Sequence, residues 1–235
     1  MTYNEKNVPV MYFNKEGGKV DKPVFSKPIP EGVTVKTVYD QYIEAIGGRE
    51  KAEEIKSVMM KGNASVQGMT LNVTIKRTVD GKMLSEVTMG GNVMNKTVFN
   101  GESGYTKMRG QKMEMSEEQI EEQKENAGLF PELEVGDEHK LESIVPVEGE
   151  DAYVVSTGED SKAYYSVDTG LKMMNITTKK QGDKEITNKE KYQDYQEVNG
   201  IKMPKKTVRE YGPQTIEMVM KEIKFNEGVS ASDFE

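Results

Sequence analysis

The stretch VTVKTVYDQYIEAIGGREKAEEIKSVMMKGNASVQGMTLNVTIKRTV, residues 33–79, contains two hydrophobic periodicities in succession. In its first part, apolar residues recur every three or four positions, which is the spacing of one buried stripe on an α-helix. Gly47 and Gly48 then end this pattern, because glycine readily adopts the left-handed backbone of helix C-termini. From Val58 the period changes to two, which is typical of a strand with one buried face. The stretch therefore predicts one short helix followed by a sheet.

The helix is predicted over residues 35–46, and Thr34 is a suitable N-cap for it. A further turn of helix is expected after Gly48 and before Ser57. The apolar stripe of the first helix consists of Val35, Val38, Tyr39, Tyr42, Ile43 and Ile46. A helix this short and this apolar on one side needs a partner surface. We therefore expect it to pack against the sheet.

One strand keeps one apolar face through Leu71, Val73, Ile75 and Val79, which Arg77 alone interrupts, and the pattern continues after a turn at residues 80–82. The apolar positions of this face are Leu71, Val73, Ile75, Met83, Val87 and Met89. Hairpin signals recur at residues 90–91 and 99–105. We expect five strands in an up-and-down meander over residues 58–109, with the apolar face buried beneath helix 35–46.

A helical insertion interrupts the meander. Ser116 and Gln119 form a capping box at its start, and Gly128 ends it before Pro131. Strands and turns then alternate from His139 to Phe225. The prediction is a mainly β protein, a single antiparallel half-barrel of about eleven strands with two or three helices packed on its concave face. So many strands enclose a large interior, which something must fill.

The composition narrows the possible functions. The chain has 235 residues and a net charge of −8 without a basic block, which argues against binding to nucleic acid. It contains no cysteine and one histidine, His139, for which we expect a solvated or capping role. The sequence motifs of hydrolases, nucleotide-binding loops, calcium loops and zinc sites are missing. We therefore expect a non-enzymatic binder or scaffold with no catalytic residue, no metal and no cofactor.

The methionines are the least ordinary feature of the composition. There are 16 of them, with no tryptophan and six phenylalanines. Methionine is flexible and polarizable, so it suits surfaces that accept apolar ligands of varied shape. It also fills ordinary cores, and both interpretations stay open. We expect Met83, Met89, Met218 and Met220 to line the interior, because they lie on strands near the two ends of the meander.

The order of helix, Gly-Gly, meander, helical insertion and second meander resembles the LolA/LolB-like periplasmic lipoprotein-carrier fold. Four stretches are similar to a domain of Bacteroidetes-type proteins, found in outer-membrane lipoprotein-sorting proteins and as a C-terminal tail of insulinase-type zinc peptidases. These stretches are VYDQYIEAIGGREKAEEIKSVMMKGNASVQGMTL at 38–71, YYSVDTGLKMM at 164–174, YQDYQEVNGIKMPKKTV at 192–208 and IKFNEGVSASDF at 223–234. The resemblance covers residues 33–235 and implies a half-barrel closed by helices, in the periplasm or otherwise outside the cytoplasm.

The resemblance also bears on the ends of the chain. No signal peptide is visible, so the protein is either cytoplasmic or has lost a leader or a larger N-terminal part. The resemblance favours the second explanation. Residues 1–32, rich in proline and glycine, then form an extended arm or an interdomain linker, and residues 33–235 form the half-barrel domain. The zinc-peptidase motif H-x-x-E-H and a lipobox cysteine are absent, and no arginine matches the functional arginine of the carriers.

Two functions follow from the resemblance. The first is a non-enzymatic periplasmic module whose concave face holds a lipid, a lipoprotein acyl chain or another apolar ligand. The alternative is a non-catalytic accessory domain whose partner is an upstream peptidase domain. Either protein is expected to be a monomer that binds no nucleic acid and does not span a membrane. The expected ligand-lining residues are Ile43, Leu71, Val73, Ile75, Met83, Val87, Met89, Met218 and Met220.

Overall fold

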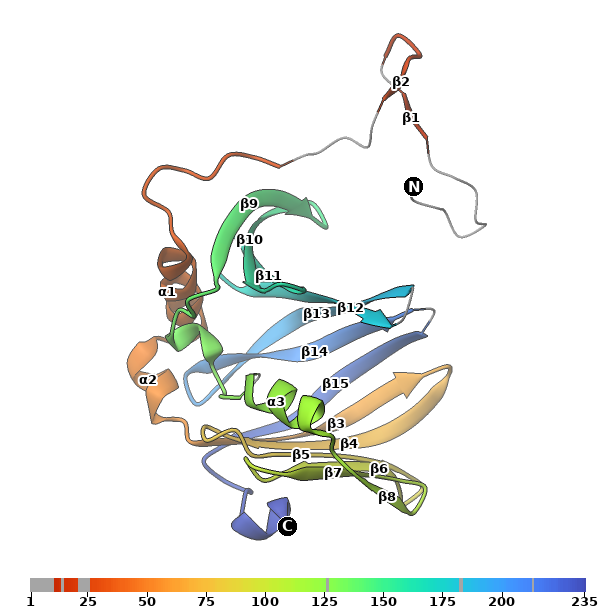
Figure 1. Ribbon diagram of the computed structural model, residues 1–235. Helices are drawn as coiled ribbons and strands as arrows, with labels where there is room; N and C mark the ends of the chain where they lie inside the picture. The colour runs from red at the N-terminus through yellow and green to blue at the C-terminus, as the bar shows by residue number, and fades with distance from the viewer. Residues whose placement is uncertain (1–10, 14, 21–25, 126, 182–183, 213) are drawn as a thin grey trace.

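The structure is a computed structural model dominated by one curved antiparallel sheet (Figure 1). It describes residues 11–13, 15–20, 26–125, 127–181, 184–212 and 214–235. In these ranges the sheet has thirteen strands in the order β8-β7-β6-β5-β4-β3-β15-β14-β13-β12-β11-β10-β9. The helices α1, α2 and α3 lie on the side toward which both ends of the sheet curve (Figure 1). The predicted mainly β half-barrel is confirmed, with more strands than the expected eleven.

Two meanders make up the sheet, and each is a run of hairpins. The first contains β3 (Ser57–Val66), β4 (Met69–Thr78), β5 (Met83–Met89), β6 (Asn92–Phe99), β7 (Gly104–Met108) and β8 (Gln111–Glu114). The second contains β9 (Lys140–Val147), β10 (Glu150–Gly158), β11 (Ser161–Ser166), β12 (Lys172–Gln181), β13 (Lys184–Val198), β14 (Ile201–Tyr211) and β15 (Gln214–Phe225). The two meanders join through β3 and β15, so the last strand of the chain lies near the middle of the sheet.

The helices agree closely with the sequence patterns. They are α1 (Val35–Ile46), α2 (Arg49–Glu54), α3 (Glu117–Glu125) and two 3-10 turns, η1 (Pro131–Leu133) and η2 (Ala231–Phe234). Thr34 caps α1, because its side chain accepts a hydrogen bond from the amide of Thr37. Gly47 ends the helix with φ of 135°, and a Cβ there would lie 2.1 Å from the carbonyl oxygen of Gly200. Only glycine fits this position.

The cap at Thr34 gives a first prediction. Thr34→Ala removes the acceptor for the Thr37 amide and is expected to cost about 1 kcal/mol of unfolding free energy. The urea midpoint of the purified protein measures this cost. Thr34→Ser retains the hydroxyl and serves as the control, so equal destabilisation by both substitutions would contradict the capping role.

The main core lies between α1 and the face of the sheet that we call the inner face. All six residues of the predicted stripe on α1 are buried. They pack with residues of both meanders, among them Val58, Val73, Tyr165, Ile201 and Met220. Helix 35–46 therefore covers part of the inner face, where Val73 is fully buried and Leu71, Ile75 and Val87 are partly buried.

The expected burial of one position on β5 was wrong. Met89 lies at the end of β5 beside the Gly90–Gly91 turn, and 41% of its surface is exposed. The alternation of apolar residues extends beyond the part of the sheet that α1, only twelve residues long, can cover. The inner face thus has a covered part and an open part.

A strand that the patterns did not predict extends the first meander. Arg109 and Gly110 form the turn between β7 and β8 and both have positive φ, 48° and 88°. Such a pair suits a two-residue hairpin, although the sequence lacks the usual Asn-Gly or Asp-Gly. β8 is fully exposed, so its sequence QKME carries no hydrophobic alternation. This hairpin accounts for one of the additional strands.

The outer face of the first meander is covered by the C-terminus. Phe234 of η2 packs with Leu84 and Val98 in a small second core. Lys76 on β4 forms an ion pair with Asp233, with 2.6 Å between nitrogen and oxygen. These contacts fix the C-terminus against the sheet.

The predicted arm, residues 1–32, is described only in part, because residues 1–10, 14 and 21–25 lie outside the described ranges. Its strands β1 (Tyr12–Phe13) and β2 (Lys19–Val20) form a small hairpin that stands away from the main sheet (Figure 1). Lys27 forms an isolated antiparallel bridge with Ile144 on β9. This bridge covers part of one edge of the sheet.

Candidate functional site

The open part of the inner face carries a group of exposed methionines. Met69 lies two residues before Leu71 on the same face of β4, and Met89 lies two residues after Val87 on the same face of β5. Met108 pairs in register with Asn95, which in turn pairs with Val87, so it shares their face. Met113 pairs with Thr106 on the same face. We call Met69, Met89, Met108 and Met113 the methionine rim; their exposed fractions run from 41 to 52%.

The predicted lining residues fall into two groups. Four belong to the buried core beneath α1: Ile43, Val73, Met218 and Met220. Leu71, Ile75 and Val87 are partly buried and pack against this core. Met83 is half-buried on β5, and Met89 is exposed. The structure therefore brings all nine to the inner face, but only some of them border its open part.

Met218 and Met220 were expected to line the interior because their strand was placed near an end of the meander, and this placement was wrong. Met218 and Met220 lie on β15, which pairs with β3 in the interior of the sheet and not at an end of it. Met218 stands opposite Ala64 and Met220 opposite Gly62, and α1 covers both. A charge at either position would be buried without a partner. Met83 and Met89 are the better positions for testing a ligand site.

An ion pair is buried where η1 meets the sheet. Glu132 on η1 is 2% exposed and pairs with Lys172 at the start of β12. The hydroxyl of Tyr165 donates a hydrogen bond of 2.8 Å to the same carboxylate. Burial, followed by the charge of Glu132, raises the pKa of Tyr165 well above its ordinary value, so the hydroxyl stays protonated. No sequence pattern predicted this pair, because a lone glutamate after a proline is typical of an exposed turn.

The single histidine has a structural role. His139 Nδ1 lies 3.0 Å from the hydroxyl of Tyr39 and accepts a bond of 3.2 Å from the amide of Gly136. Its ring also stacks edge-on against Tyr39. The expected capping role is confirmed, and the residue ties the loop before β9 to α1.

A second polar group lies on the inner face of β12, β13 and β14, beyond the part that α1 covers. Arg209 Nε donates a hydrogen bond of 2.8 Å to Glu190, and the hydroxyl of Tyr192 donates one of 3.2 Å to the same carboxylate. Asn175 Nδ2 donates to the Tyr192 hydroxyl at 3.0 Å. Tyr192 pairs in register with Thr207, which pairs with the core residue Met218. These side chains therefore share the face of the core.

Arg77 reaches this group from the other wall of the half-barrel. It follows Val73 and Ile75 on the same face of β4. The charges of Glu190 and Arg209 act on it, so its guanidinium lies within electrostatic range of β13 and β14. Burial lowers the pKa of Arg77 despite the opposing effect of Glu190. We call Arg77, Asn175, Glu190, Tyr192 and Arg209 the arginine cluster.

Hydrophobic periodicity did not predict the arginine cluster, although one feature of the sequence pointed toward it. Arg77 was noted as the interruption of an apolar face, and Glu190 occupies an inner position of β13. Charged residues at inward positions of two strands favour a polar site inside the barrel. Their contact depends on strands far apart in the sequence, which periodicity alone does not bring together.

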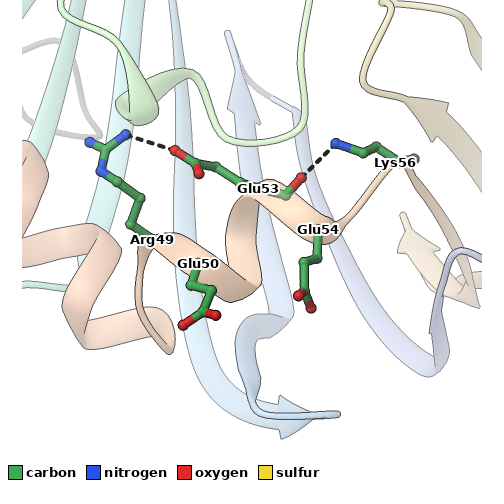
Figure 2. Close-up of a pocket in the computed structure, with 5 residues that line it drawn as sticks. All are labelled: Arg49, Glu50, Glu53, Glu54 and Lys56. Atoms are coloured by element: carbon green, nitrogen blue, oxygen red, sulfur yellow. Dashed lines mark hydrogen bonds and ion pairs between the residues drawn. The ribbon is translucent and has the colours of Figure 1, made fainter.

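Two surface depressions lie elsewhere. One of about 720 Å³ is bounded by Arg49, Glu50, Glu53, Glu54 and Lys56 around α2 (Figure 2). Arg49 bonds Glu53 at 3.2 Å, while Glu50 and Glu54 point away from it (Figure 2). The other, of about 520 Å³, lies between the β9–β10 hairpin and β13, where Lys191 pairs with Glu148 at 2.6 Å. Charged walls make the first a poor site for an apolar ligand.

Within the described ranges, no three His, Asp or Glu side chains converge to form a metal site. None of the helices in the described part of the chain has the length and apolar character that a membrane crossing needs.

Comparison with known proteins identifies the fold. No protein-family model matches the sequence, and no curated protein matches it. Solved structures do match: a LolA superfamily protein from Nitrosomonas europaea has a TM-score of 0.59 and 11% identity, over 87% of this chain and 98% of that chain. The chain therefore has a LolA-like half-barrel fold, as the sequence resemblance implied.

Two other structures support the same assignment. A DUF1329 family protein from Desulfovibrio piger has a TM-score of 0.55 and 13% identity, over 86% of this chain and 97% of that chain. A domain from Vibrio parahaemolyticus, assigned to outer membrane lipoprotein sorting, has a TM-score of 0.56 and 10% identity, over 79% of this chain and 92% of that chain. Identities this low establish the shared fold alone.

Proposed function

We propose that the protein is a non-enzymatic module, located outside the cytoplasm, that binds a lipid, an acyl chain or another apolar ligand on its inner face. The observation that carries this proposal is the methionine rim. Its four residues are exposed although they continue the face that α1 buries. Flexible thioether side chains suit a surface that accepts apolar chains of varied shape. The similarity to a lipoprotein-sorting domain from Vibrio parahaemolyticus supports the same class of ligand.

The division of the inner face limits where a ligand can lie. α1 fills the part beside Val58, Val155 and Ile201, and its own side chains are buried there. The part between Met83 and the methionine rim is half-buried or exposed. A ligand on this part would bury apolar surface that water otherwise covers, which contributes about 25 cal/mol for each Å².

Binding of straight-chain alcohols to the purified protein tests this proposal. Displacement of the neutral dye Nile red reports their affinity. Each additional methylene contributes about 0.8 kcal/mol, so affinity is expected to rise roughly fourfold per carbon until the site is full. Met83→Glu and Met89→Glu should each weaken binding about tenfold or more, because they place a charge against the chain.

Val79→Glu is the matched control for these variants. Val79 is half exposed and lies in the β4–β5 turn, where its amide bonds to Lys56, at the end of the sheet opposite the rim. The Val79→Glu variant should bind the alcohols as the unmodified protein does. Circular dichroism checks that each variant is folded. Absence of any dye uptake or alcohol binding would overturn the proposal.

The alternative function is a non-catalytic accessory domain of a larger protein, such as the tail of an insulinase-type peptidase of the Bacteroidetes type. The exposed rim also favours this candidate, because exposed apolar patches often mark protein interfaces. The same Nile red titration distinguishes the ligand-binding function from the accessory-domain function. Failure of the dye and of every alcohol to bind would leave the partner-domain function as the better one.

A further inference from the structure

We propose that the ligand is a single-chain amphiphile with an anionic acid group, and that Arg77 and Arg209 bind this group on the inner face. The inference rests on the proposed function and adds the chemical class of the ligand. A carboxylate and a phosphate monoester share the required chemistry, which is a compact anion at one end of an apolar chain.

The charges of the arginine cluster favour an anion. It holds two guanidinium groups and one carboxylate, which gives a net charge of +1. Glu190 already accepts bonds from Arg209 and Tyr192. Arg209 makes this contact through Nε, and a guanidinium has four further N–H donors in a fork that matches an acid group. The cluster can therefore bind an anion without losing its internal bonds.

A ligand can reach the outer part of the arginine cluster, and the deeper part of the cluster is poorly hydrated. The Arg209 side chain is 56% exposed and that of Glu190 is 25% exposed, so a headgroup can reach them. Arg77 lies deeper, and burial lowers its pKa, which means that its charged form is poorly hydrated. An anion beside it would be attracted more strongly than in bulk water, because a charge pair is stronger where water is scarce.

Two buried amide oxygens on β12 and β13 concern the water that would accompany a headgroup. Asn175 Oδ1 and Asn188 Oδ1 are buried and have no hydrogen-bond partner among the described residues. The amide group of Asn175 is oriented by its bond to Tyr192, so its oxygen is an acceptor that needs a donor. Buried acceptors of this kind normally have a partner. An ionised headgroup donates no hydrogen bond to them, so water that enters with the headgroup would supply the donors.

The apolar part of the ligand has a mostly apolar track from the cluster, which Ser85 alone interrupts on β5. Arg77 pairs in register with Met83, and Val87 and Met89 follow on the same face of β5. The seven residues from Met83 to Met89 span about 20 Å of strand. A long acyl chain that starts at Arg77 can lie along this track and end at the methionine rim.

Three probes with the same hexadecyl chain test the inference: hexadecanoic acid, its methyl ester and hexadecyltrimethylammonium. Nile red displacement is measured at a pH where the acid is ionised. The acid should bind at least about tenfold more tightly than the ester, and the ammonium more weakly than the ester. Arg77→Met and Arg209→Met should each remove most of this preference and leave the affinity for the ester unchanged.

Controls keep the outcomes distinct. Arg49→Met removes an arginine on α2 and should retain the full preference for the acid. If Arg77→Met fails to fold, Arg77→Lys and the exposed Arg209→Met carry the test. Equal binding of acid and ester, or tighter binding of the ammonium, would overturn the headgroup assignment while the proposed function stands. Failure of all three probes to bind would instead overturn the proposed function.

Discussion

Ile43→Asp is expected to unfold the protein or to lower its unfolding free energy by more than about 4 kcal/mol. Ile43 is 2% exposed and lies at the centre of the apolar stripe of α1. An aspartate there would lose its hydration without gaining a partner, and it would leave a cavity between α1 and the sheet. Loss of the cooperative thermal transition, followed by circular dichroism, is the measurement.

Two variants on the same helix serve as controls. Gln41→Asp introduces the same side chain at an exposed position of α1 and is expected to change stability by less than about 1 kcal/mol. Ile43→Val retains the apolar character and should cost about 0.5–1.5 kcal/mol. A thermal transition of Ile43→Asp like that of Gln41→Asp would contradict the packing of α1 on the inner face.

Local signals predicted the helices well because each depends on neighbouring residues. The stripe on α1, its cap at Thr34 and its end at Gly47 lie within fourteen residues of one another, and the structure has the helix over the predicted residues. The same holds for the capping box of α3, where Ser116 and Gln119 bond reciprocally. Such features require no knowledge of the rest of the fold.

Pairing between distant strands could not be predicted in the same way. The pairing of β15 with β3 joins residues more than 150 positions apart, such as Met218 and Ala64. Hydrophobic periodicity tells which face of a strand is buried but not which strand lies beside it. The two methionines of β15 were therefore placed on the correct face and in the wrong part of the sheet.

The polar features of the inner face were missed for a related reason. Arg77 and Glu190 approach one another across the half-barrel, and Glu132 meets Lys172 only after η1 packs beneath α1. In the sequence each is an ordinary charged residue. Only the curvature of the sheet brings them together, and inward charges become informative once the fold is known.

Glu132→Gln is expected to cost about 3–5 kcal/mol of unfolding free energy, because it leaves the charge of Lys172 buried without its partner. Glutamine retains the shape of the side chain and an oxygen that can accept the bond from Tyr165, so the substitution tests the charge itself. The Lys172 side chain is only 13% exposed, and water cannot replace the lost partner fully. Urea denaturation measures the change.

A double substitution separates the ion pair from the packing around it. Glu132→Gln combined with Lys172→Met removes both charges and should be more stable than Glu132→Gln alone, because no unpaired charge remains. Glu142 and Lys162 form an exposed pair at 2.5 Å, and Glu142→Gln should cost less than about 1 kcal/mol. If Glu132→Gln were as mild as Glu142→Gln, the buried pair would not hold η1 against the sheet. A large cost that Lys172→Met reverses would show that the charge pair fixes η1, and with it α1, over the covered part of the inner face.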